Sequence, residues 1–134
     1  SVVPSPEMTA ARSKKATKSL SESCEMVVNL KGNATITLSN DKGENVVMLY
    51  DAKAETFSMD RTKSGKMDFS NDFAATTKAP TYGKISQLRI FIDKSSIEVF
   101  DAEGKMAMTN LVFPTKPYNK VTVKGGKYQV YNIK

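Results

Sequence analysis

The side chains that could do chemistry in this chain are carboxylates, lysines and tyrosines. Its 134 residues include no histidine and one cysteine, Cys24. Without imidazole there is no Ser-His-Asp or Cys-His nucleophile system and no histidine metal ligand. A lone cysteine forms no internal disulfide and no thiolate zinc site, and its place in an apolar stretch predicts a small buried side chain. We therefore expect no metal site and no cofactor.

The carboxylates form no evident pair. Hydrolysis of a glycosidic bond needs two of them at a set separation. Asp93 and Asp101 fall in turn sequences, where hydrogen bonds to the local backbone explain an acidic residue. Glu98 alternates with Ile97 and Val99, which predicts that it points away from the core. We therefore predict no catalytic residue in this chain.

The charge distribution argues against a nucleic acid as partner. The formal net charge is +6, a balance that nucleic-acid-binding proteins share. All the basic residues except Arg12, Arg61 and Arg89 are lysines, spread mostly one at a time, whereas readers of bases and phosphates favour arginine. No apolar run approaches the roughly 20 residues that cross a bilayer. We expect neither a nucleic acid nor a membrane as partner.

The elements that would position these residues are short strands. Apolar and polar residues alternate with period two, as in half-buried strands, over 23–30, 34–38, 46–50, 56–60, 88–93, 96–100, 106–113, 120–124 and 127–133. Turn sequences separate them, among them Gly125-Gly126. About nine to eleven strands at this spacing predict an all-β antiparallel β-sandwich, of the lectin or concanavalin A-like jelly-roll kind.

Residues 1–19 have a different pattern. Pro4 and Pro6 give an extended start, and 7–18 combine helix formers with a basic cluster but little apolar periodicity. This composition favours a solvated linker or short helix. We therefore divide the chain into 1–19 and a sandwich module over 20–134.

Two stretches of the sequence resemble a known family. One reads LRIFIDKSSIEVFDAEG over 88–104 and continues as MTNLVFP over 108–114; the other reads DRTKSG over 60–65. Both are similar to signatures of the C-terminal β-sandwich of glycoside hydrolase family 32, which includes invertases, inulinases and levanases. The residues that carry the resemblance are Asp60, Arg61, Ser64, Gly65, Asp93, Ser95, Ser96, Glu98, Phe100, Gly104, Thr109, Phe113 and Pro114.

The resemblance implies that catalysis lies outside this chain. The family's catalytic carboxylates belong to an N-terminal five-bladed β-propeller, and their motifs, Trp-Met-Asn-Asp-Pro-Asn-Gly, Arg-Asp-Pro and Glu-Cys, do not occur here. The implied partner is that propeller in the same polypeptide, with 1–19 as the interdomain linker. The DRTKSG segment over 60–65, together with Phe69 and Phe73, resembles levanase- and inulinase-type members more than sucrose-6-phosphate hydrolases. The family resemblance also implies a secreted or periplasmic parent, with fructan or sucrose as ligand.

Most of the motif residues are expected to be structural. Asp93, Ser95 and Ser96 would cap backbone groups of their turn, and Phe100 and Phe113 would fill the core. Arg61 is expected to pair with a carboxylate, Asp93 or Glu98, because its fork-shaped side chain favours such an acceptor.

The function that follows is a non-catalytic module of a β-fructosidase that supports an absent catalytic domain. A docking surface for that domain is expected near residues 4–19, close to the linker. The alternative is a free-standing, lectin-like carbohydrate-binding module, since sandwiches of this kind host unrelated functions. Exposed tyrosines around a groove away from the linker would favour that alternative.

Overall fold

A computed structural model describes residues 12–66 and 75–133 of the chain. The described part contains nine strands and no helix, which confirms the all-β antiparallel prediction. In chain order they are β1 (Arg12–Thr17), β2 (Cys24–Ser39), β3 (Asn45–Asp51), β4 (Thr56–Asp60), β5 (Thr76–Pro80), β6 (Gln87–Ile92), β7 (Ser96–Asp101), β8 (Ala107–Leu111) and β9 (Lys120–Ile133).

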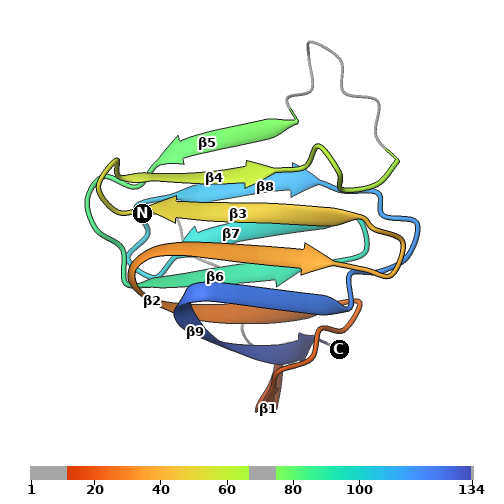
Figure 1. The fold of residues 1–134 in the computed structure, drawn as a ribbon. Coiled ribbons are helices and arrows are strands. Elements are labelled where there is room, and N and C mark those ends of the chain that lie inside the picture. Colours follow the sequence, from red (N-terminus) through yellow and green to blue (C-terminus); the bar gives the residue numbers. More distant parts are fainter. Residues whose placement is uncertain (1–11, 67–74, 134) are drawn as a thin grey trace.

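Two long strands, β2 and β9, run through both layers of the sandwich (Figure 1). Residues 34–39 of β2 pair with β3 and with the start of β9, which makes a first layer ordered β5-β4-β3-β2-β9. Residues 24–29 of β2 pair with β6 and with the end of β9, which makes a second layer ordered β8-β7-β6-β2-β9-β1. The strands β6, β7 and β8 of the second layer lie behind the first layer in Figure 1.

The bend that carries both strands between the layers lies where the sequence predicted that one strand ends and the next begins. The pairing of β2 with β9 shifts register between Leu30 and Thr35, and Gly125 has a φ of 84° there. A Cβ on Gly125 would lie 2.0 Å from the carbonyl oxygen of Asn33. The turn predicted at Gly125-Gly126 is therefore wrong, because these glycines let two paired strands bend together rather than reversing the chain.

Both strands that the sequence did not predict lie at layer edges. β1 pairs with β9 at one edge of the second layer, where the sequence favoured a helix or linker over 7–18. β5 pairs with β4 at one edge of the first layer. Edge strands are held by backbone hydrogen bonds and need no regular apolar face, so periodicity does not reveal them. The division of the chain at residue 19 stays a prediction.

The core lies between the two layers and follows strand alternation. Its fully buried side chains include Met26, Ile36, Met48, Phe57 and Ile90. Cys24 is also fully buried, and burial raises the pKa of its thiol, as expected for a cysteine that acts as a small apolar side chain.

Substitutions at the bend test its dependence on Gly125. Gly125→Ala should lower the free energy of unfolding by at least about 2 kcal/mol, because a Cβ would meet the Asn33 carbonyl in a backbone conformation that L-residues avoid. Gly32→Ala is the matched control on the facing strand, since a Cβ there meets nothing within 4 Å. Urea denaturation measures both, and equal stability of the two variants would contradict the assignment.

Candidate functional site

The two family-like motifs meet on one segment, 111–113, at the edge of the sandwich. Arg61 donates a hydrogen bond from Nη1 to the carbonyl oxygen of Leu111 at 2.7 Å. The amide of Lys66 donates to the carbonyl of Phe113 at 3.0 Å. The amide of Val112 donates to the carbonyl of Ser95 at 3.0 Å. The segment after β8 is therefore bonded to the first layer on one side and to the β6–β7 turn on the other.

Arg61 reaches this segment because β4 ends in a tight turn. Asp60 Oδ1 accepts hydrogen bonds from the amide and the hydroxyl of Thr62, at 2.8 and 2.7 Å, and the Ser64 amide donates to the Arg61 carbonyl at 3.0 Å. Arg61 is 2% exposed, and burial lowers the pKa of its guanidinium. It stays charged, because arginine ionises far above neutral pH.

The acceptors expected for Arg61 lie elsewhere. Asp93 Oδ1 accepts from the amide of Lys94 at 2.7 Å, and Glu98 lies on the outer face of the second layer beside Thr109. Neither of the two named partners is therefore bonded to Arg61, and its pairing with a carboxylate stays a prediction. Among the described residues, Arg61 donates to a carbonyl at the end of a strand, which is an acceptor that no sequence pattern reveals.

Gly65 and Tyr118 complete the edge. A Cβ on Gly65 would lie 2.3 Å from the carbonyl oxygen of Phe113, so only glycine allows this approach of backbone to backbone. The Tyr118 hydroxyl donates to the carbonyl of Ser64, and burial raises the pKa of that hydroxyl well above its ordinary value.

The turn of the second motif is structural, as expected for Asp93. The Asp93 amide donates to the Ser96 carbonyl at 2.9 Å, and its carboxylate caps the following amide. Ser95 contributes its carbonyl to Val112. Capping by the two serine side chains stays a prediction. Pro114 follows the bonded segment and is half-buried.

Two polar side chains that sequence reasoning missed also make hydrogen bonds at this edge. Asn110 is buried and donates from Nδ2 to Thr77 Oγ1 at 2.9 Å, from one layer to the other. Glu44 Oε1 accepts from the amide of Thr115 at 2.8 Å and from Asn40 at 2.9 Å. Burial raises the pKa of Glu44, but these bonds outweigh it and leave that pKa below its ordinary value. The inward parity of Asn110 was the available signal.

The remaining motif residues lie away from this edge. Ile97 and Val99 are fully buried while Glu98 is partly exposed on the opposite face, which confirms the orientation predicted for Glu98. Phe100 is buried on that outer face, edge-on to Phe91 at 5.9 Å between ring centroids, rather than in the core between the layers.

Phe113 and Gly104 also lie outside the core. Phe113 is 44% exposed, so the expectation that it fills the core is wrong: it lies beyond the end of β8, where its backbone carries the contact. Gly104 lies in the β7–β8 hairpin at the opposite end of β7, with a φ of 74°. Thr109 is exposed on β8.

The described residues of this site bond the two layers to each other. Within the described residues, no three His, Cys, Asp or Glu side chains group as metal ligands. The cavity beside Asp93 and Tyr118 holds about 100 Å³, well below the roughly 300–1,000 Å³ of pockets for drug-sized ligands. Asp68, Phe69, Asp72 and Phe73 lie outside the described residues. No helix in the described part could span a membrane.

The described part of the chain is an all-β sandwich, and residues of both motifs hold the edges of its two layers together. The family model for the C-terminal region of glycosyl hydrolases family 32 matches residues 4–134. The chain belongs to this family.

Curated relatives agree with that assignment. The chain is 36% identical over 106 residues to sucrose-6-phosphate hydrolase of Vibrio alginolyticus, covering 78% of the chain and 21% of the relative. It is 32% identical over 98 residues to an extracellular exo-inulinase of Aspergillus niger, covering 71% and 17%. A levanase of Bacillus sp. strain L7 is 31% identical over 100 residues, covering 72% and 11%. The chain thus spans a fifth or less of the length of most of these relatives.

Solved structures share the fold. Exo-inulinase of Aspergillus awamori matches with a TM-score of 0.75 and 22% identity, over 95% of this chain and 31% of that one. Sucrose-6-phosphate hydrolase of Lactobacillus gasseri matches with a TM-score of 0.77 and 21% identity, over 98% and 30%.

Removing the donor of Arg61 should destabilise the domain. Arg61→Met keeps much of the side-chain length but leaves the Leu111 carbonyl without this donor, so we expect a loss of about 2 kcal/mol in the free energy of unfolding. Chemical denaturation measures it. Lys78→Met, at an exposed position on β5, is the control and should change stability by less than about 0.5 kcal/mol. Equal effects of the two substitutions would show that the Arg61 contact holds nothing together.

Proposed function

We propose that this chain is the non-catalytic β-sandwich module of a β-fructosidase and that it supports a catalytic domain in the same polypeptide. The observation that carries the proposal is the use of the family motifs at 111–113, where Arg61, Ser95 and Gly65 bond or pack against backbone. Residues committed to holding two layers together are not available to a substrate.

The carboxylates of the described part support a non-catalytic role. Asp60 and Asp93 cap turn amides. Asp101 is fully buried and accepts from the amides of Glu103 and Met106, at 3.0 and 2.6 Å. Glu103 pairs with Lys105 at 3.1 Å. Each has a structural partner, and none forms the exposed pair that glycoside hydrolysis needs.

The relatives suggest what the module would support. Their names describe hydrolysis of sucrose 6-phosphate, inulin and levan, and the chain matches only a small part of each. We propose that the catalytic domain of the parent acts on β-fructosides, that fructan or sucrose is its substrate, and that the parent is secreted or periplasmic. The free-standing lectin-like module is the alternative.

The docking surface near residues 4–19 stays a proposal. Residues 4–11 lie outside the described part. The large apolar side chains that the structure describes as exposed are elsewhere, at Leu49, Tyr82, Leu111 and Phe113. Leu111 and Phe113 are the two ends of the bonded segment 111–113, so this edge offers apolar anchors to a partner domain.

The isolated chain should release no fructose from sucrose, inulin or levan. The described carboxylates are spread over turns and the outer face, so no pair can act as acid and nucleophile. Fructose release is measured by a coupled assay on two independent preparations.

Release that scales with the amount of protein in both preparations would contradict the proposal. Support of a catalytic domain is tested in the full-length parent carrying Arg61→Met. Its activity should be lost at a lower temperature while its KM is unchanged, with Lys78→Met as the control. A changed KM with unchanged heat inactivation would favour a role in substrate binding instead.

A further inference from the structure

The bend of β2 leaves a cavity at the end of the sandwich that carries the β7–β8 hairpin. It holds about 270 Å³ and lies between the bend, the loop 81–86 and that hairpin. Its apolar floor includes Leu30, Tyr50 and Ile85, and its rim carries Lys31, Lys84, Ser86 and Glu103. None of the residues that line this cavity belongs to the edge formed by Arg61, Gly65 and 111–113.

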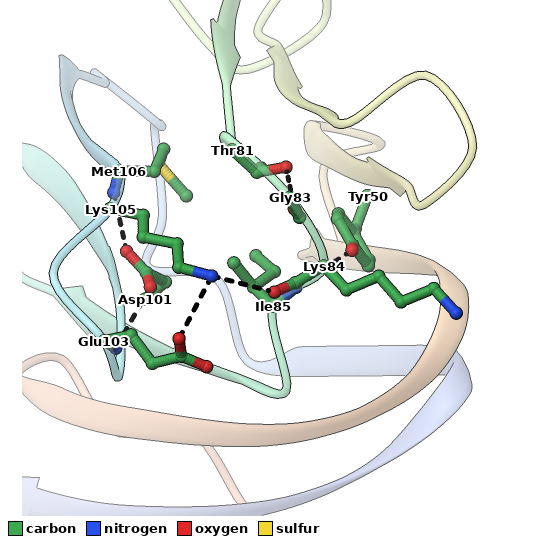
Figure 2. Close-up of polar contacts among 9 residues, drawn as sticks. All are labelled: Tyr50, Thr81, Gly83, Lys84, Ile85, Asp101, Glu103, Lys105 and Met106. Carbon is green, nitrogen blue, oxygen red and sulfur yellow. Dashed lines mark hydrogen bonds and ion pairs between the residues drawn. The ribbon is translucent and has the colours of Figure 1, made fainter.

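The polar atoms of the cavity floor are already hydrogen-bonded within the protein. The amide of Ile85 donates to the hydroxyl of Tyr50 at 3.1 Å (Figure 2), and Tyr50 is 2% exposed. The amide of Leu30 donates to the carbonyl of Ser86 at 2.8 Å. The polar atoms beneath the cavity are thus already satisfied, so the floor presents an apolar surface.

The loop over the cavity is held in an unusual backbone conformation. Tyr82 has a φ of 53°, which is uncommon for a bulky residue, and Gly83 has a φ of 110°. The Thr81 hydroxyl donates to the Gly83 carbonyl at 2.8 Å, and the Thr81 amide donates to the Glu55 carbonyl at 2.9 Å. Strain of this kind persists only where the surroundings enforce it, and such strain clusters at ligand sites.

The rim offers both donors and acceptors. Lys105 bridges the carboxylate of Glu103, at 3.1 Å, and the carbonyl of Lys84, at 3.4 Å, and so joins the hairpin to the loop (Figure 2). Within the described part of the chain, the side chains of Lys31, Lys84 and Ser86 make no hydrogen bond or ion pair with protein. Their ammonium and hydroxyl groups remain available to a ligand.

We propose that this cavity binds one sugar ring of a neutral saccharide. A ring places C–H groups on an apolar floor and needs donors and acceptors around its edge, which is the distribution found here. A metal ion would need more than the one carboxylate of the rim, which is already paired with Lys105. The lysines of the rim would also attract an anion, so inorganic phosphate is the control ligand. That the sugar is a fructosyl unit rests on the proposed function, whereas the cavity itself does not.

The test is titration of the ¹⁵N-labelled chain with fructose and with an inulin-type trisaccharide, followed by NMR. Saturable shifts confined to the amides of 30–32 and 84–86 are expected. Lys31→Ala, whose side chain supports no other group in the described part, should weaken binding about tenfold through loss of a charged hydrogen bond. Lys78→Ala, on β5 outside the cavity, should leave it unchanged.

Three results would overturn the proposal: no saturable shift at the highest soluble sugar concentration, equal affinity of Lys31→Ala and wild type, or equal shifts with inorganic phosphate. The last would identify an anion site. None of them would affect the proposed function, because support of a catalytic domain needs no sugar at this cavity. Conversely, sugar binding would persist in a chain that supports no catalytic domain.

Discussion

The hydrogen bond from the buried guanidinium of Arg61 to the carbonyl of Leu111 is the constraint on which the edge of the sandwich depends. A buried charge is costly unless it is well bonded, and the carbonyl of Leu111, the last residue of β8, accepts a hydrogen bond from this side chain. The amides of Lys66 and Val112 then find their acceptors on or beside the same short segment. The first and second layers are closed together at this edge, in addition to their packing through the core.

The bend depends on the absence of a side chain rather than on a hydrogen bond. There β2 and β9 must turn together without losing their pairing, and Gly125 permits it by placing no side chain against Asn33. The same bend opens the cavity below the loop 81–86. The molecule therefore has one end closed by polar bonds between layers and another where continuous strands join the layers and leave a hollow. The bonds that stabilise the module and the cavity that could bind a ligand therefore lie at different ends of the sandwich.

Sequence pattern was sufficient where burial is on one side only. Alternation located β3, β4, β6 and β7 and the outward direction of Glu98, because each of these strands faces the core with every second residue. It failed at β1 and β5, which are edge strands. It also failed at the bend, where the glycines lie within a strand rather than in a turn. At the site, the motifs named Arg61 and Gly65, but their partners are backbone carbonyls. No residue type encodes such a partner, so only the fold could reveal it.

A structural role for the motifs predicts a specific pattern of native-state hydrogen exchange. The amide of Val112, which is fully buried and donates to Ser95, should exchange only through global unfolding, with the same free energy and denaturant dependence as the amide of Ile90 in the core. Exchange of Val112 through a local opening several kcal/mol below the global value, with little denaturant dependence, would contradict it. The edge would then be a loosely held loop, and the motif residues would need another reason to be there.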